Sequence, residues 1–403
     1  MLYNPELQAL ATPTQLQNYA DVLVNAGLGK GTGIKPGDVV LIRFEPEAAL
    51  LLPYIQTSVT KAGGHLLRES KIPYPPVDSP TYAVAAAGTP EQIAFFPTAP
   101  LEALYKETQH FVFLRSLAYN EPNPYVNNPL YQTRLIVERT LRDIERDYKE
   151  NHWQSYTLGY VPTIASAAQS GISLVEFWDE IVTTCYLNEP DAASKMKQLI
   201  AQTSAIESAI NALNITHLHV TGPNANLHIG LVPQARFRSS RGGNIPSFEC
   251  FVTPDAEQTS GWIRFSYPLI FEGTSIKDLH VTFTNGEVSH WTTSSGAETF
   301  AAMLALPGMN RLGEFALTDK RLSLISRVIP GAPVFLENIG GTGHVAFGRG
   351  YKKCFVDVRD TPHCNESIDH RDVVFGQDFT VTATCADQSN VVLFADGRFN
   401  LEI

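Results

Sequence analysis

The sequence predicts an α/β protein with two domains: an N-terminal open α/β sheet domain of βαβ units, then a mixed, largely antiparallel α+β domain. In the N-terminal part, short apolar runs alternate with helical patterns, as strands and crossover helices do around a parallel sheet. After residue 212 this alternation stops, and strand-like runs follow one another between turn residues. We therefore expect an N-terminal domain over 1–165, and a helical connector with a C-terminal domain over 166–403.

Strands separated by helices are expected in the first domain. Val39 to Phe44 is a nearly continuous apolar run, which is typical of a strand buried on both faces of a parallel sheet. The helical pattern before it ends at Gly27, and glycine commonly follows the last turn of a helix. The expected helices cover 14–26, 47–62 and 130–149, and the expected strands cover 39–44, 65–68, 111–114 and 155–161.

Two helical patterns between residues 172 and 212 lead into a region of strands and turns. Asn285-Gly286 and Asp396-Gly397 are dipeptides that favour tight hairpin turns, and each stands between strand-like runs. The second domain is therefore expected to be mainly antiparallel. Its expected strands cover 218–220, 228–232, 248–253, 262–267, 279–284, 314–317, 334–336, 355–358 and 379–384.

The composition argues against several classes of protein. The chain has 403 residues, of which 44% are hydrophobic and 18% charged, so it can bury large cores. No apolar stretch approaches the roughly 20 residues that span a bilayer. A formal net charge of −11 argues against nucleic acid and anionic membranes as partners. A soluble enzyme of small-molecule or peptide metabolism fits these features better.

The first residues and the cysteines both indicate a cytoplasmic location. Residues Met1 to Pro5 have neither the basic region nor the apolar core of a signal peptide. The five cysteines are odd in number and form no CxxC pair. We therefore expect reduced thiols, and neither a disulfide framework nor a zinc ribbon.

Residue types that bind metal ions are concentrated near the C-terminal end. His344 is followed by His370 and Asp372, which are two residues apart and would face the same side of a strand. Imidazole nitrogens and carboxylate oxygens together suit a zinc-like or cobalt-like ion. A histidine bonded to a nearby carboxylate is also a common structural pair, so this spacing alone is not specific.

Glu249 and Glu314 add two carboxylates in segments that are otherwise apolar. A buried carboxylate is costly unless it is paired or bound to a metal, so both glutamates are candidate ligands. Either could instead point from its strand into solvent, and Tyr351 in the same region could be a core aromatic. The sequence leaves these alternatives open.

The candidate ligands lie within a series of short motifs that extends over most of the chain. These motifs are Tyr19 to Val24, Pro36 to Ile42, Leu218 to Pro223 with Asn226 and Gly230, Asn244 to Pro246 with Glu249, Leu312 to Glu314, Glu337-Asn338 with His344 and Tyr351, and Asn365 with His370 and Asp372. In order and spacing, they resemble the aminopeptidase T and aminopeptidase S family of dinuclear metalloaminopeptidases. No single motif is decisive, but their shared order is specific.

The resemblance implies an enzyme that releases N-terminal amino acids from peptides and forms a homodimer. It also implies a C-terminal catalytic domain that binds two divalent ions, most often zinc or cobalt, with manganese or iron as further candidates. The implied ligands are Glu249, Glu314, His344, His370 and Asp372, with Tyr351 beside them.

Two divalent ions a few ångströms apart can hold a water between them, lower its pKa and polarise the scissile carbonyl. We favour Glu249 as the bridging carboxylate, with Glu314 and His344 completing the site of one ion. His370 and Asp372 would then complete the other, although the sequence leaves this partition open.

Two further residues are candidates for roles in the reaction. The phenol of Tyr351 could donate a hydrogen bond to the oxyanion that forms when the carbonyl is attacked. Glu337 is a candidate for carrying a proton to the leaving amine. The chain departs from the family pattern in the glycine-rich segment 340–343 and at Arg371, so a broad leucine-type specificity is not implied.

Two other functions compete with this interpretation. In the related ring-cleaving dioxygenases one Fe(II) is held by two histidines and a carboxylate, and His344, His370 and Asp372 could form such a triad. A mononuclear iron site does not need Glu249 and Glu314, so the presence of both favours the peptidase. The altered segment 340–343 also leaves open a family member without catalytic activity.

Two glycine-rich segments fit nucleotide-binding patterns only formally. Residues 341–346 match GxGxxA, but the helix that should begin there is interrupted by Gly348 and Gly350. Residues 27–33 follow a helix, whereas a phosphate-binding loop should follow a strand. We therefore expect loops at both places and no nucleotide site.

Overall fold

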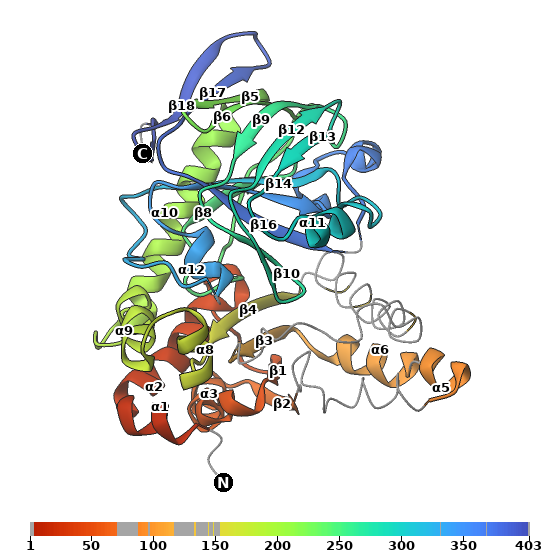
Figure 1. Cartoon of the computed structure of the whole chain (residues 1–403). Helices are drawn as coiled ribbons and strands as arrows, with labels where there is room; N and C mark the ends of the chain where they lie inside the picture. The colour runs from red at the N-terminus through yellow and green to blue at the C-terminus, as the bar shows by residue number, and fades with distance from the viewer. Residues whose placement is uncertain are drawn as a thin grey trace. The chain divides into compact units, whose positions relative to one another are not determined.

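The computed structural model describes residues 4–70, 88–95, 97–116, 154–330, 332–367 and 369–401, together with Thr133, Ile144 and Tyr148. Figure 1 shows these residues in colour and labels their main helices and strands. Within these ranges, no helix has both the length and the apolarity needed to cross a membrane.

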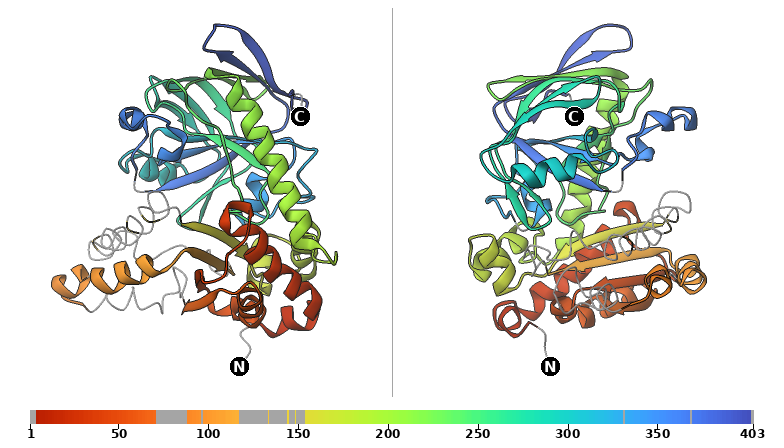
Figure 2. Two further views of the ribbon diagram at one scale, coloured as in Figure 1. Left: turned by 180° about the vertical axis from the view of Figure 1, so that it is seen from behind. Right: turned by 45° about the vertical axis from the view of Figure 1, so that its right-hand side comes forward.

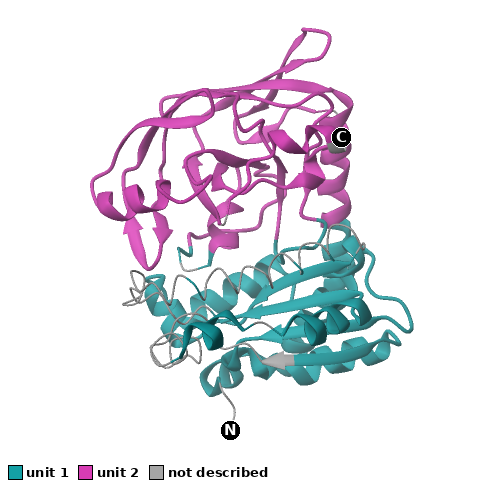
Figure 3. Ribbon diagram, turned by 90° about the vertical axis from the view of Figure 1, so that its right-hand side faces the viewer, with its two compact units in different colours: residues 1–198, 241–246, 329–332 teal, residues 199–240, 247–328, 333–403 magenta. Residues whose placement is uncertain are grey.

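The chain divides into two compact units, which Figure 3 shows in different colours. The first contains residues 1–198, 241–246 and 329–332, and the second contains residues 199–240, 247–328 and 333–403. Two short segments of the later sequence thus belong to the first unit. The domain boundary expected at residue 165 stays a prediction, because a compact unit and an independently folding domain are different properties.

A parallel sheet forms the centre of the first unit, with strand order β2-β1-β3-β4. Its strands are β1 (Val39–Phe44), β2 (His65–Ser70), β3 (His110–Arg115) and β4 (Ser155–Tyr160). In β1 the side chains of Val40, Leu41 and Ile42 are all buried, as expected for a strand that is covered on both faces. The parallel pairing confirms the predicted open α/β sheet.

Short helices surround the strands of the first unit, and several begin with a capping box such as Ser173 with Glu176. The helices are α1 (Pro5–Leu10), α2 (Pro13–Asp21), α3 (Leu52–Lys61), α5 (Pro90–Ala94), α6 (Thr98–Glu107), α8 (Ile164–Gln169) and α9 (Leu174–Thr184). Tighter or wider turns are η1 (Val22–Gly27), η2 (Gly29–Gly31) and η3 (Pro46–Leu51). The helix expected over 130–149 lies, apart from three residues, outside the described ones.

The long helix α10 (Ala192–Ala212) leads into the second unit, where its residues Ile206 and Ile210 join the core. Two antiparallel sheets dominate that unit, with strand orders β13-β12-β9-β6-β5-β17-β18-β19 and β16-β15-β14-β8-β7. The strands of the larger sheet are β5 (Ile215–Gly222), β6 (Ala225–Gly230), β9 (Thr259–Arg264), β12 (His280–Thr284), β13 (Glu287–Thr292), β17 (Thr380–Cys385), β18 (Asn390–Ala395) and β19 (Arg398–Phe399).

The smaller sheet contains β7 (Arg238–Ser239), β8 (Glu249–Val252), β14 (Leu312–Thr318), β15 (Gly343–Gly348) and β16 (His370–Gly376). The remaining elements of the unit are the hairpin β10 (Leu269–Phe271) with β11 (Thr274–Ile276), the helices α11 (Ala297–Leu304) and α12 (Pro333–Glu337), and the turns η4 (Lys352–Cys354) and η5 (Val358–His363). Both predicted hairpin turns, Asn285-Gly286 and Asp396-Gly397, are confirmed between paired strands.

One apolar core contains residues of both sheets. Figures 1 and 2 show the strands of the two sheets in this unit. Phe283 of β12 and Phe347 of β15 come from different sheets, and their ring centroids are 6.1 Å apart. The rings of Phe375, in β16, and Phe379, next to β17, are 4.8 Å apart. The predicted fold class, an α/β protein with a mixed and largely antiparallel second part, is therefore confirmed.

Two of the expected strands are wrong. Residues 334–336 form part of helix α12, because Pro333 is preorganised for the first position of a helix and a short buried run has no periodicity that separates strand from helix. Residues 355–358 pair with no strand in the part of the chain that the structure describes, and the N–H of Phe355 donates instead to the carbonyl of Lys352 within a tight turn.

The end of β14 is tied to the last strand of the larger sheet by Asp319. The carboxylate of Asp319 is fully buried and accepts hydrogen bonds from the N–H of Phe399, at 2.9 Å, and from the guanidinium of Arg321, at 2.6 and 2.9 Å. Burial alone would raise the pKa of Asp319, but these hydrogen bonds from Arg321 and Phe399 lower it below its usual value.

We predict that Asp319→Asn lowers the free energy of unfolding by about 1–3 kcal/mol at pH 7, since hydrogen bonds to a charged group are lost. The pKa of Asp319 is lower in the folded state than in the unfolded state, so its contribution is complete above the unfolded pKa of about 3.9. That contribution disappears as the pH falls through the folded pKa. Urea denaturation at several pH values would measure the difference, with exposed Asp387→Asn as control. A difference that does not change with pH would contradict this account.

Candidate metal centre

Register in the smaller sheet places the predicted ligands on one face. Ala316 stands opposite His344 and Thr318 stands opposite Glu249, while Glu314 precedes both by an even number of residues on the same strand. Side chains two residues apart on a strand point to the same face. β14 is the neighbour of both β8 and β15, so Glu314 lies between Glu249 and His344 in the sheet order.

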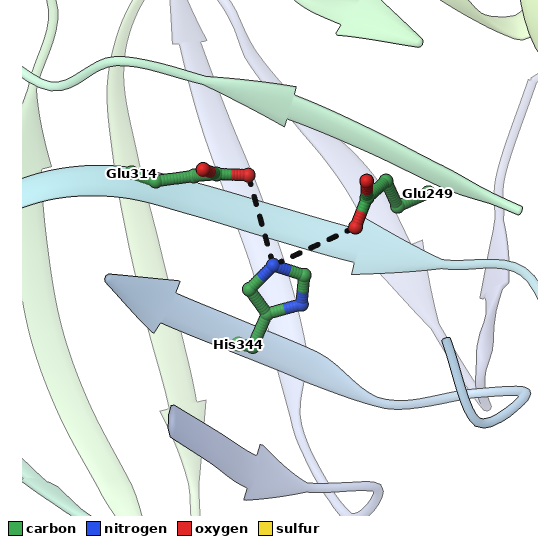
Figure 4. Close-up of side chains that lie close together, drawn as sticks. All are labelled: Glu249, Glu314 and His344. Atoms are coloured by element: carbon green, nitrogen blue, oxygen red, sulfur yellow. Dashed lines mark ion pairs between the residues drawn. The ribbon is translucent and has the colours of Figure 1, made fainter. Parts of the chain in front are cut away.

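The first group of candidate ligands is Glu249, Glu314 and His344, and all three are buried. The Nε2 atom of His344 lies 3.6 Å from Oε1 of Glu314 and 3.7 Å from Oε2 of Glu249. Figure 4 shows the imidazole of His344 facing one carboxylate oxygen of each glutamate. The two carboxylates and the imidazole therefore converge on a common point.

A second group contains Glu314, His370 and Asp372. The Nε2 atom of His370 lies 3.1 Å from Oε2 of Glu314 and 3.3 Å from Oδ1 of Asp372. All five predicted ligands thus come together, and Glu314 is shared by the two groups. The sequence analysis favoured Glu249 for a shared position, whereas this geometry favours Glu314.

Negative charge is in excess in this buried cluster. Burial raises the pKa of Glu249 to about 7, although the charge of His344 lowers it. For Glu314, burial acts in the same direction, but hydrogen bonds from His344 and His370 lower its pKa to about 2. Burial lowers the pKa of His344, but the hydrogen bond to Glu314 and the nearby carboxylates raise it to about 10. Burial also lowers the pKa of His370, but the neighbouring carboxylates of Asp372 and Glu314 raise it well above its usual value.

Tyr351, the predicted catalytic residue, lies beside the second group. Its Oη atom is 3.5 Å from Nε2 of His370, and its ring packs against that of Phe251 with centroids 5.4 Å apart. The backbone N–H of Tyr351 donates to Oγ1 of Thr253 at 2.8 Å. These contacts hold the phenol at the edge of the cluster.

Neighbouring backbone groups orient the ligands. The Nδ1 atom of His370 is 2.6 Å from the carbonyl oxygen of Arg349, which directs Nε2 toward the cluster. The side-chain oxygen of Asn338 accepts the N–H of Phe248 at 2.6 Å and thereby fixes the residue before Glu249. The carbonyl of Arg349 was not among the predicted site groups, and no pattern in the sequence distinguishes it. Asn338 was named only as part of the Glu337-Asn338 motif, without a role.

The donor set fits divalent ions. Oxygen and nitrogen ligands at about 2.0–2.2 Å from a tetrahedral ion lie roughly 3.3–3.6 Å from one another. The separations of 3.1–3.7 Å from the Nε2 atoms of His344 and His370 to the glutamates are close to this range. Oδ1 of Asp372 is a buried oxygen to which no described residue donates a hydrogen bond of normal geometry. This is expected of an oxygen that serves as a ligand of a cation.

Neither of the two glycine-rich segments adopts the local structure of a nucleotide-binding loop. Gly343 begins strand β15, where a dinucleotide loop would require a helix. Gly29–Gly31 is a tight turn that follows helical residues and not a strand. The loop expected over 341–346 is wrong from Gly343 onward, where β15 begins, and the expectation of no nucleotide site at these two places stays a prediction.

The fold and the cluster together define a metallohydrolase. A family model described as thermophilic metalloprotease (M29) matches residues 12–399. The chain belongs to this family, and the predicted class of enzyme, a metalloaminopeptidase, is confirmed at the level of the family.

Similar proteins are consistent with that assignment. Aminopeptidase 2 of Geobacillus stearothermophilus is 22% identical, over 96% of this chain and 98% of that protein. Aminopeptidase PepS of Streptococcus thermophilus is 26% identical over 58% of this chain, and the match spans 60% of PepS. The structure of wild-type AmpT from Thermus thermophilus has the same fold, with a TM-score of 0.72 and 19% identity, covering 97% of this chain and 100% of that one.

We predict that Asn338→Ala weakens metal binding by about 10–100-fold, because groups that orient metal ligands have effects of this size. Competition with a chelator of known affinity would measure it. Asn211→Ala is a matched control, since Asn211 makes a similar bond to the N–H of Phe237, at 2.8 Å, away from the cluster. Equal losses of metal affinity in the two variants would show that Asn338 has no specific effect on the cluster.

Proposed function

We propose that the protein hydrolyses the N-terminal peptide bond of peptides at a site for two divalent ions. The sharing of Glu314 between two groups of ligands carries the proposal, because a carboxylate with one oxygen directed to each group is suited to bridge two ions. Glu249 and His344 would complete one ion site, and His370 and Asp372 the other. Zinc or cobalt are our first choices, and manganese or iron also suit such oxygen and nitrogen donors.

Bound divalent ions would lower the pKa of a water in the site and polarise the carbonyl of the scissile bond. The chain's own residues supply the rest of the chemistry. The phenol of Tyr351 would donate a hydrogen bond to the oxyanion that develops on the attacked carbonyl. The bond from His370 to the carbonyl of Arg349 would keep the imidazole in the orientation that ligation needs.

The proposal includes a peptide substrate with a free N-terminus, a homodimer and a cytoplasmic location, in line with the sequence analysis. His344 and His370 both lie near Asp372, at 3.8 and 3.3 Å, as the competing Fe(II) dioxygenase would require. A mononuclear site, however, leaves Glu249 and the sharing of Glu314 without a purpose. A family member without catalytic activity would be expected to lose some of these converging groups.

The proposal is tested by elemental analysis of the purified protein together with hydrolysis of unblocked aminoacyl amides. We expect about two divalent ions per chain and release of the N-terminal residue. Glu249→Ala should lose metal and activity together, whereas Glu257→Ala, a change at an exposed position, should retain both. One iron per chain with oxygen consumption on a hydroxylated ring would instead identify a dioxygenase, and full activity in Glu249→Ala would remove that residue from the site.

We predict that Tyr351→Phe lowers kcat by about 100–1,000-fold while metal content stays unchanged, since one donor to an oxyanion contributes this much. Steady-state kinetics and elemental analysis on the same sample would measure both. A variant with nearly normal kcat would show that the phenol does not act in the rate-limiting step.

A further inference from the structure

One positive charge lies beside the cluster and belongs to neither group of candidate ligands. The ammonium of Lys353 stands over two aromatic rings, with Nζ 5.0 Å from the ring centroid of Tyr351 and 5.0 Å from that of Phe251. The ring of Tyr351 is in turn 5.1 Å from that of His370. Phe251 follows Glu249 by two residues on β8, so these two side chains point to the same face of the sheet. The ammonium is therefore at the edge of the cluster.

Hydrogen bonds fix the backbone of Lys353, so this charge has a defined position. The guanidinium of Arg238 donates two hydrogen bonds to the carbonyl of Lys353, from Nε at 3.0 Å and from Nη2 at 2.7 Å. The next residue, Cys354, is fully buried, and its N–H donates to the carbonyl of Tyr351 at 3.0 Å. The side chain of Lys353 itself is exposed, and the faces of the two rings attract its ammonium. The positive charge is thus preorganised and open to a ligand.

No acidic side chain in the described part of the protein neutralises Lys353 by an ion pair within 4.0 Å. Its neighbour Lys352 differs, because the ammonium of Lys352 lies 2.5 Å from a carboxylate oxygen of Glu366. A lysine ammonium has three N–H donors, and aromatic rings do not accept hydrogen bonds as strongly as oxygen does. The N–H groups of Lys353 are therefore available to an anion that enters the site.

A carboxylate on the leaving part of a peptide has the chemistry that this charge would recognise. The residue before the scissile bond carries an ammonium, which an ammonium of the protein repels. The residue after the scissile bond can carry a carboxylate, as the C-terminus of a dipeptide or as an acidic side chain. One residue of an extended chain spans about 3.3–3.6 Å. With the attacked carbonyl at the phenol of Tyr351, such a carboxylate would be in reach of Nζ, which is 5.0 Å from the centroid of the same ring.

We propose that Lys353 binds a carboxylate on the residue that follows the scissile bond, and so gives the enzyme a preference for dipeptides and for an acidic second residue. This inference rests on the proposed function and adds the recognition of the leaving part of the substrate. Lys353 is in this view a substrate-binding residue that determines specificity. It is neither a metal ligand nor the donor to the oxyanion, which is the part proposed for Tyr351.

The test uses two pairs of substrates whose members differ in one charge. The first pair is alanyl-alanine and its C-terminal amide, and the second is the C-terminal amides of alanyl-aspartate and alanyl-asparagine. In the metal-loaded wild type, kcat/KM should be about three- to tenfold higher for the charged member of each pair, mainly through KM. Lys353→Met, which keeps an apolar side chain over both rings, should remove both preferences and leave metal content and kcat for the neutral substrates unchanged.

Two further variants serve as controls. Lys353→Arg retains the positive charge and should retain part of both preferences. Lys352→Met removes the same charge from the next residue, which is also exposed, and should retain the preferences in full.

Binding without hydrolysis gives a second readout. An alanyl-alanine in which the scissile amide is reduced to a methyleneamine has no carbonyl that can be attacked. Calorimetric titration should show that the metal-loaded wild type binds this compound about three- to tenfold more tightly than its C-terminal amide. Lys353→Met should bind the two compounds equally.

Several results would overturn the inference. A wild type without preference in either pair is one, and an equal loss of preference in Lys352→Met is another, because it would show a general effect of charge. Loss of metal in Lys353→Met, or a lower kcat for the neutral substrates, would give Lys353 a different role. A preference for glutamyl-alanine amide over glutaminyl-alanine amide that Lys353→Met removes would place the charge on the other side of the scissile bond. A wild type that binds the charged analogue more tightly but hydrolyses no peptide would refute the proposed function alone.

Discussion

The site depends above all on the register of the five-stranded sheet. Glu314 and His344 reach the same face because Ala316, two residues after Glu314, stands opposite His344. Between them, Phe315 and Val345 point to the other face and are fully buried in the apolar core. A shift of one residue would exchange the two sets, placing phenylalanine at the cluster and a carboxylate in the core. The register that packs the apolar core is therefore the same register that brings the polar groups of the cluster together.

A second constraint is the electrostatic imbalance that the fold sustains. Glu249, Glu314 and Asp372 are held together with two histidines in a region where water can stabilise few charges. Among the described neighbours, the charge of Lys353 lowers the pKa of Glu249 less than Glu314 and Asp372 raise it, and others act by orientation, as Asn338 does by accepting the N–H of Phe248. Such an arrangement lowers the stability of the folded protein without metal and raises its affinity for cations, since a cation is attracted more strongly by uncompensated charge than by groups already paired.

The sequence was sufficient for most strands, because apolar residues leave a pattern along the chain, and the resemblance to the family supplied the candidate ligands that the structure brings together. The sequence was insufficient where the position or role of a residue depends on how the chain folds. The short apolar run over 334–336 fits a strand and a helix equally well, and the helix forms because Pro333 favours its first position. The central position of Glu314 follows from β14 lying between β8 and β15, an order that differs from chain order. Asn338 stands in a motif that the sequence analysis named, but its hydrogen bond to a residue 90 positions away could not be read from the sequence.

The sharing of Glu314 has a consequence for how metal binding is observed. One side chain contributes to both groups, through Oε1 toward His344 and Oε2 toward His370. If the two groups bind one ion each, as proposed, occupation of either position would change the charge and the freedom of a ligand of the other. By thermodynamic linkage the effect is reciprocal and equal in free energy. The two ions would have no separate affinities, and a titration would report a property of the pair.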